Sequence, residues 1–235
     1  MRLDKFLADL QVGSRSQVKE YVKKGLVTVN GQAVKKADIK IDETKDEVRY
    51  QGKLLSYQRY RYYMLHKPAG VVTATKDNLD KTVIDLLPKE LVKDIFPVGR
   101  LDKDTEGLLL LTNDGELSHN LLSPKKHVAK TYYVECDGQL NDAKITQLCQ
   151  GVDIGDEDIT LPAAVEVVRI DSDRYVIKLT ITEGRFHQVK RMIQAVDGQV
   201  TYLKRLSMGS LILDESLAKG DFRELTDEEI SGLKS

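Results

Sequence analysis

The apolar positions of the first 50 residues predict two helices followed by short strands. Apolar residues recur with helical spacing over residues 3–10 and 15–24, and Ser14 can cap the second of these helices. Strands are expected over residues 26–29 and 47–50, with a tight-turn signal at Asn30-Gly31 after the first strand. This segment is therefore expected to fold as a small unit of its own.

A polar stretch at residues 51–60, which we interpret as a linker, precedes an alternation of strands and helices. The expected strands cover residues 62–65, 71–75, 108–112, 131–135, 164–170, 175–182 and 221–225. The expected helices cover residues 82–87, 114–122, 141–150, 187–196 and a final segment that opens at Thr226. The pattern predicts an α+β fold with a mixed, mainly antiparallel sheet, divided into domains over residues 1–58 and 59–235.

Composition is that of a globular chain with no export or membrane segment. The 235 residues are 41% hydrophobic and 31% charged. The longest apolar run, Leu108–Leu111, is far shorter than the ~20 residues of a membrane helix, and no signal-peptide core follows Met1. Cys136 and Cys149 lie outside any C-x-x-C motif, so neither a disulfide framework nor a zinc site is indicated. We expect a cytoplasmic protein and, with no apolar stripe to predict a dimer, a monomer.

Charge is distributed unevenly along the chain. Residues 1–60 contain 13 Lys and Arg against 8 Asp and Glu, a net charge of +5, whereas the remaining residues contain 23 against 29, a net charge of −6. The basic side chains of the two expected helices include Arg2, Lys5, Arg15, Lys19 and Lys23. The last three share one helical stripe, which suits contact with phosphates. A solvated helical face explains the same pattern equally well.

The N-terminal unit resembles the S-four RNA-binding domain. The resemblance is carried by Arg2–Ala8, by Ser14-Arg15-Ser16 and by Gly25–Gln32. That module occurs in several enzymes and ribosomal proteins. The resemblance therefore implies an RNA ligand for this unit and no particular reaction.

Three further segments contain residues that could carry chemistry. Gly99–Gly115 packs four acidic and two basic side chains around an apolar strand, where a rigid element could hold a catalytic carboxylate. A capped surface loop explains this segment as well. A calcium loop matches only its first half, because Asn113 stands where a bidentate Glu is required. A hydrolase that uses Asp102 and Glu106 as an acid–base pair is a further alternative.

The other two segments are Glu183–Met192 and Ala129–Val134. In the first, a helix that begins near His187 would place His187, Lys190 and Arg191 on one face beside positive helix-terminal amides. In the second, Tyr132 and Tyr133 point to opposite faces of a strand, so only one of them can line a given pocket. A structural histidine and a core tyrosine are the simpler interpretations of these fragments taken singly.

Taken together, the three segments resemble the pseudouridine synthases, specifically the ribosomal-RNA family that carries an N-terminal S-four domain. The residues that carry the resemblance are Gly99–Asp102 with Thr105–Leu109, Lys130–Tyr132, and Glu183–Arg185 with His187–Val189, supported by His66–Val72 and Leu203–Gly209. The resemblance implies a catalytic domain with a central mixed sheet. It also implies isomerisation of a uridine to pseudouridine without metal or cofactor.

The resemblance also implies roles for individual residues. Asp102 matches the catalytic aspartate and Tyr132 the tyrosine that stacks on the uracil. A carboxylate in a closed pocket needs a cation beside it to stay ionised, and Lys190 matches that cation, with neighbouring Arg191 as the alternative. Arg100 is expected to fill the gap left by a flipped base. The RNA-binding residues expected in the catalytic domain are Arg100, Arg185, His187, Gln188 and Arg191.

The resemblance is closest to synthases that act on small-subunit (16S) ribosomal RNA, free or in a subunit assembly intermediate. An S-four domain in a short chain without a basic C-terminal tail favours that substrate over large-subunit RNA. A non-catalytic RNA-binding assembly factor is the alternative from another functional class. It predicts that replacement of Asp102 leaves function intact while neutralisation of Arg15 and Lys19 abolishes it.

Overall fold

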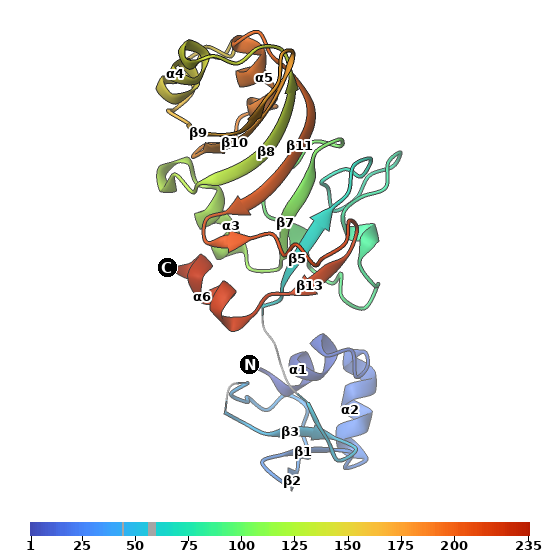
Figure 1. The fold of residues 1–235 in the computed structure, drawn as a ribbon. Helices are drawn as coiled ribbons and strands as arrows, with labels where there is room; N and C mark the ends of the chain where they lie inside the picture. The colour runs from blue at the N-terminus through green and yellow to red at the C-terminus, as the bar shows by residue number, and fades with distance from the viewer. Residues whose placement is uncertain (44, 56–59) are drawn as a thin grey trace. The chain divides into compact units, whose positions relative to one another are not determined.

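The computed structural model describes residues 1–43, 45–55 and 60–235, and the chain divides into two units, Met1–Arg59 and Tyr60–Ser235 (Figure 1). The expected domain boundary between residues 58 and 59 lies outside the described residues. Within the described ranges, no helix combines the length and the apolar character needed to cross a bilayer.

The N-terminal unit packs two helices against a four-stranded antiparallel sheet. Its elements are α1 (Leu3–Asp9), α2 (Arg15–Lys23), β1 (Val27–Val29), β2 (Gln32–Ala33), β3 (Val48–Tyr50) and β4 (Lys53–Leu55), with sheet order β2-β1-β3-β4. Ser14 and Gln17 form a reciprocal capping box at the start of α2. Apolar side chains of both helices, including Phe6 and Val18, form the core together with Val27 of the sheet. The two helices and the strands at residues 27–29 and 48–50 confirm the sequence-based expectation.

The linker interpretation was wrong for residues 51–55. Gln51 and Gly52 have φ angles of 49° and 80°, and their turn connects β3 to β4. The apolar pair Leu54-Leu55 belongs to that last strand, so this stretch completes the N-terminal sheet. The rest of the expected linker, residues 56–59, lies outside the described residues.

The second unit is built on a mixed sheet, which confirms the α+β class. Its strands are β5 (Tyr62–Lys67), β6 (Phe96–Pro97), β7 (Glu106–Thr112), β8 (Lys130–Asp137), β9 (Ala164–Ile170), β10 (Arg174–Ile181), β11 (Gln199–Met208), β12 (Leu211–Ile212) and β13 (Phe222–Glu224). The strand order is β13-β5-β7-β11-β8-β10-β9. In addition, β12 pairs with β11 and β6 pairs with β7. The pairing of β7 with β11 is parallel, whereas the other pairings given for this sheet are antiparallel.

Helices cover this sheet and complete two apolar cores. They are α3 (Gly115–Leu122), α4 (Asp142–Gln150), α5 (Gln188–Ala195) and α6 (Asp227–Lys234) (Figure 1). The four leucines of β7 alternate between the cores because successive strand residues face opposite sides. Leu109 and Leu111 join the core that contains α5 residues, whereas Leu108 and Leu110 join the core that contains α3 residues.

A close approach of two backbones brings β7 beside β11. Gly107 pairs with Arg205 and has a φ angle of 103°, and a Cβ at this position would clash with the Arg205 backbone. Only glycine permits both the conformation and the spacing. The contact matters because β11 and the residues before β7 both border the site described below.

Two expected elements differ from the structure, and one strand was not expected. The strand expected at residues 71–75 is reduced to a single bridge between Val72 and Thr82, and the helix expected at residues 82–87 is a short 3-10 turn, Ile84–Leu86. The longest strand, β11, was missed. Its charged central residues, Lys204 and Arg205, obscure the apolar alternation on which strand prediction depends.

Candidate active site

Asp102 lies in the loop that leads from β6 into β7, and hydrogen bonds fix this loop. Thr73 Oγ1 donates to the Leu101 carbonyl oxygen at 2.7 Å and accepts from the Leu101 amide at 3.2 Å. The Thr105 amide donates to the Asp102 carbonyl oxygen at 3.1 Å. The strand that follows is buried along its whole length, so the carboxylate projects from a rigid support.

A buried lysine anchors the same loop from β5. The Lys67 ammonium group is fully buried and donates to the carbonyl oxygens of Lys103 and Thr105 at 3.2 and 2.8 Å. Burial lowers the pKa of Lys67 to about 8. Sequence analysis assigned no role to this residue. The available signal was its position between a buried strand and the Pro68-Ala69-Gly70 turn.

Two side chains of residues 187–190 meet the Asp102 carboxylate. Lys190 Nζ lies 3.2 Å from Asp102 Oδ2, and His187 Nε2 lies 3.5 Å from Asp102 Oδ1. Lys190 also donates to both carboxylate oxygens of Asp104, at 2.7 and 2.8 Å. The ammonium group therefore joins two carboxylates, of which Asp102 is the less exposed, at 26% against 71%.

The charges of Lys190, Asp102 and Asp104 stabilise one another. Burial opposes the charged form of Lys190, but the hydrogen bonds to Asp104 and Asp102 outweigh it and raise its pKa above the usual value. The hydrogen bond from Lys190 likewise lowers the pKa of Asp104 below its usual value. The arrangement thus contains a lysine that stays protonated beside two carboxylates.

Asp102 borders a cavity of about 120 Å³ between the loop before β7, the sheet and the start of α5. Tyr132, on β8, is 8% exposed and also lines this cavity. Arg100 lines it too and is exposed. The remaining lining residues are Gly99, Leu101, Thr105, Leu122, Lys130, Ile181, Gly184, Arg185, His187, Gln188, Val189, Lys190, Leu203 and Arg205. Three predicted catalytic residues, Asp102, Tyr132 and Lys190, therefore share one pocket.

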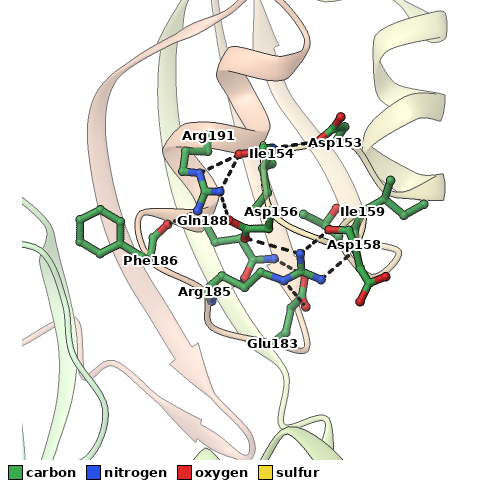
Figure 2. Close-up of polar contacts among 12 residues, drawn as sticks. Asp153, Ile154, Asp156, Asp158, Ile159, Glu183, Arg185, Phe186, Gln188 and Arg191 are labelled. Carbon is green, nitrogen blue, oxygen red and sulfur yellow. Dashed lines mark hydrogen bonds and ion pairs between the residues drawn. The ribbon is translucent and has the colours of Figure 1, made fainter.

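Arg191, the alternative partner of Asp102, is turned to another part of the molecule. Its guanidinium group bonds the backbone carbonyl oxygens of Ile154 and Phe186 and the carboxylate of Asp156 (Figure 2). Lys190 is one residue earlier on the helix, and one residue rotates the side chain by about 100°. Of the two basic neighbours, the structure places only Lys190 beside Asp102.

Arg185 and Gln188 are also bonded to protein groups. Arg185 donates to Glu183 and to the carbonyl oxygens of Asp158 and Ile159, as Figure 2 shows. Gln188 is 3% exposed, accepts from the Arg185 amide and donates to Glu183. Both side chains therefore hold the start of α5 in place, and direct RNA contact by them stays a prediction.

His187 is placed differently from the expected helical residue. It precedes α5 with a φ angle of 49°, and its ring stacks on that of Phe186 at 3.8 Å. Phe186 is 74% exposed. An exposed aromatic residue thus lies directly beside a residue of the cavity wall, a feature that sequence analysis did not single out.

The predicted RNA-binding residues of the N-terminal unit lie at its surface. Arg15, Lys19 and Lys23 are exposed on α2, and Lys5 is exposed on α1. Arg2 is exposed as well, but two of its nitrogens bond the buried carboxylate of Asp4. Phosphate contact by these side chains stays a prediction.

Glu106 does not join Asp102 in the cavity. Its carboxylate accepts from the Tyr202 hydroxyl at 2.6 Å and pairs with Lys219 Nζ at 2.7 Å. This geometry counts against the acid–base pair of a hydrolase. It also counts against a calcium loop, because Asp102 and Asp104 bond Lys190 while Glu106 bonds other partners.

Two known sequence families match this chain. The sequence profile of the RNA pseudouridylate synthase family matches residues 61–195, more than half of the chain, and that of the S4 domain matches residues 1–48.

The chain belongs to the RNA pseudouridylate synthase family.

Relatives of this synthase match it from end to end. An uncharacterized RNA pseudouridine synthase, YtzG, of Bacillus subtilis is 51% identical over 98% of this chain and 97% of the relative. Ribosomal small subunit pseudouridine synthase A of Escherichia coli K12 is 41% identical over 99% of this chain and all of the relative. A crystal structure of a pseudouridylate synthase is 38% identical, with a TM-score of 0.70 and 99% of each chain covered. The synthase is accordingly an enzyme with an N-terminal RNA-binding domain.

Proposed function

We propose that this synthase isomerises a specific uridine of small-subunit (16S) ribosomal RNA, with Asp102 as the catalytic residue. The observation that carries the proposal is the contact of Asp102 with Lys190 at the wall of a cavity that Tyr132 also lines. The carboxylate faces the sugar of a uridine that has left the RNA stack, and Lys190 compensates its negative charge.

Asp102 serves one half of the reaction, at the sugar. As the bond between C1′ and N1 breaks, positive charge develops on the ribose and the carboxylate stabilises it. Asp102 does this by attack at C1′ or by removal of the C2′ proton. The base then turns, and C5 bonds to C1′ as the bond to Asp102 breaks or as the C2′ proton is returned. A second carboxylic acid, as used by glycosidases, is not required because the base stays in the pocket and is not released to water.

Tyr132 and Arg100 serve the base and the RNA. Tyr132 is largely buried beside the cavity, which suits stacking on a uracil ring. Arg100 is exposed at the cavity wall, where its side chain can fill the space that the flipped base leaves. The exposed basic residues of α2 bind the RNA backbone, which is a sequence-independent contribution to affinity.

The small-subunit substrate rests on relatives. Several curated relatives about two-fifths identical over almost the full chain are named ribosomal small subunit pseudouridine synthase A. Ribosomal RNA or an assembly intermediate in the cytoplasm is therefore the proposed partner, and the synthase acts on it as a monomer.

The test of substrate uses RNA transcribed with tritium at uracil C5, because isomerisation releases that tritium to water. We expect the wild-type synthase to release close to one equivalent per small-subunit RNA and none from large-subunit RNA. Release from large-subunit RNA alone would transfer the proposal to that substrate. Binding without release from either RNA or from partly assembled subunits would favour the non-catalytic assembly factor. Free uracil as product would instead indicate a hydrolase.

A further inference from the structure

Two basic side chains from neighbouring strands form part of the cavity wall together with Tyr132. Arg205 of β11 is the register partner of Tyr132, so both side chains project from the same face of the sheet. Lys130 lies two residues before Tyr132 on β8 and shares that face. Arg205 is 2% exposed and Lys130 is 8% exposed, and both line the cavity.

Neither cation has an acidic partner among the residues that the structure describes. Arg205 Nε donates to the Leu108 carbonyl oxygen at 2.8 Å, but its buried Nη2 has no hydrogen-bond partner. Lys130 Nζ donates to the Val128 carbonyl oxygen at 2.9 Å. Burial, and then the charge of Arg205, lower the pKa of Lys130. Uncompensated buried cations are costly, and such a cost is typical of functional sites.

A third polar group of the cavity is also unpartnered. The Thr105 hydroxyl is buried and makes no hydrogen bond, although Thr105 lines the cavity. The cavity therefore presents a carboxylate from the loop before β7 and, from the sheet, two cations whose hydrogen-bonding capacity is not used up within the protein. This distribution of charge fits a ligand that becomes positive at one end and negative at the other.

We propose that Arg205 and Lys130 bind the uracil base and stabilise the negative charge that it acquires when the glycosidic bond breaks, an inference that rests on the proposed function. When the C1′–N1 bond breaks, its electron pair stays on the base, which becomes a uracil anion with charge on N1, O2 and O4. The positive charge of the ribose is neutralised at Asp102, by a bond to C1′ or by transfer of the C2′ proton. Cations aimed at the developing anion lower the barrier without reorganisation.

At this position, a cation suits an isomerase better than a proton-donating acid would. An acid would protonate N1 and yield neutral uracil, whose C5 is a poor nucleophile, and hydrolysis would follow. The anion held by Arg205 and Lys130 keeps the electrons with which C5 attacks C1′. As C5 attacks, the bond from Asp102 to C1′ breaks or the C2′ proton returns from Asp102. The C5 proton then passes to water and N1 takes up a proton, so pseudouridine has the same atoms as uridine.

The leaving group itself provides the test. A fluorine at C5 withdraws electrons and stabilises the uracil anion, so the reaction of 5-fluorouridine depends less on protein cations. Small-subunit RNA is transcribed with uridine or 5-fluorouridine, and loss of the target nucleoside is followed under single-turnover conditions by digestion and mass spectrometry. We expect Arg205→Met to slow the reaction of uridine by about 100-fold or more, and that of 5-fluorouridine at least tenfold less.

The ratio of the two rates separates this role from a structural one. Loss of folded protein lowers both rates equally and leaves the ratio at the wild-type value. Arg205→Lys, which keeps the charge, should restore much of the ratio, and Lys130→Met should shift it in the same direction as Arg205→Met. Arg169→Met removes an exposed cation of the edge strand β9 that pairs with Asp171 and does not line the cavity. It is the matched control and should leave the ratio unchanged.

Two results would overturn the inference. An unchanged ratio in Arg205→Met would assign Arg205 a packing role only. If that variant does not fold, Lys130→Met is measured in its place, and an unchanged ratio in Lys130→Met has the same meaning. A wild-type protein that transforms neither nucleoside would refute the proposed function itself, and the inference with it. The two failures are therefore distinguishable.

Discussion

The short segment of residues 183–191 has two sides, and each side contacts a different part of the molecule. On one side, His187 and Lys190 contact the Asp102 carboxylate at 3.5 and 3.2 Å. On the other side, Arg185 and Arg191 bond the backbone and side chains of the loop at residues 153–159 (Figure 2). Basic residues close together in sequence are thus divided between contact with Asp102 and support of the loop at residues 153–159.

The difference follows from helix geometry and from the partners available. Lys190 and Arg191 are successive residues, so they point about 100° apart around the axis of α5. Arg191 has a planar group with several donors and meets two carbonyl oxygens and a carboxylate, which suits a structural clamp. Lys190 is a point charge that two carboxylates can share. Charge alone therefore does not tell which of the two residues contacts Asp102.

The largest expected effect comes from the side that faces Asp102. Lys190→Met should lower the single-turnover rate of pseudouridine formation by about 100- to 1000-fold, because Asp102 loses its compensating charge. The melting temperature should change little, since this ammonium group is partly exposed. Tritium release and thermal unfolding measure the two quantities on the same preparation. A rate within a few-fold of wild type would remove Lys190 from the reaction.

Substitution of Lys67 tests how strongly this residue holds the loop that carries Asp102. Lys67→Met should lower the free energy of unfolding by about 2–3 kcal/mol, because the carbonyl oxygens of Lys103 and Thr105 lose their buried donor. The wild-type protein also has a pH signature. The folded-state pKa of about 8 lies below the ordinary 10.5, so the unfolded chain binds more protons between these values.

This difference in proton binding predicts a rise in the stability contribution of Lys67 with pH. The rise should run from about pH 8 to pH 10.5, by at most about 1.4 kcal/mol per pH unit, and Lys67→Met should lack it. Urea unfolding of both proteins across this range measures the difference. Parallel pH profiles for the two proteins would show that Lys67 carries no such shift.

Substitution on the side that faces the loop at residues 153–159 should lower stability more than activity. Arg191→Met should lower the free energy of unfolding by about 1–2 kcal/mol, since three acceptors lose a donor at a partly exposed site. The melting temperature should fall by about 2–8 °C while the rate stays within tenfold of wild type. The opposite pattern, full stability with a lost rate, would place Arg191 in the reaction and break the comparison.

The smallest effect is expected from cations that lie at the surface of the N-terminal unit. Arg15→Gln with Lys19→Gln should weaken RNA binding by a few-fold and flatten the dependence of log affinity on log salt by about one to two units. The catalytic rate at saturating enzyme should not change. Filter binding at several salt concentrations measures the slope. An unchanged slope would show that Arg15 and Lys19 do not contact RNA phosphates and only form a solvated surface.

Sequence patterns were sufficient where local and tertiary preferences agree. The helices of residues 3–9 and 15–23 and the leucine strand β7 follow from apolar spacing and a capping signal, and the structure confirms them. The family resemblance also identified Asp102, Tyr132 and Lys190 in advance, and they line one cavity. Their catalytic roles remain predictions.

Other features depend on partners that are distant in sequence. Strand β11 owes its place to the close approach at Gly107, which no local pattern in residues 199–208 announces. The burial of Lys67 and Arg205 depends on the carbonyl oxygens of Thr105 and Leu108, which lie on or beside another strand. Such pairings appear only when the sheet is assembled, because a charged residue on a strand ordinarily predicts exposure.

Comparison of Asp102→Asn with Asp104→Asn tests the central claim most directly. Both substitutions remove a carboxylate bonded to Lys190, but only Asp102 lines the cavity. With small-subunit RNA labelled at uracil C5, Asp102→Asn should release no tritium above background, while Asp104→Asn should stay within tenfold of wild type. Release by Asp102→Asn at the rate of Asp104→Asn would contradict the assignment of Asp102 as the catalytic residue.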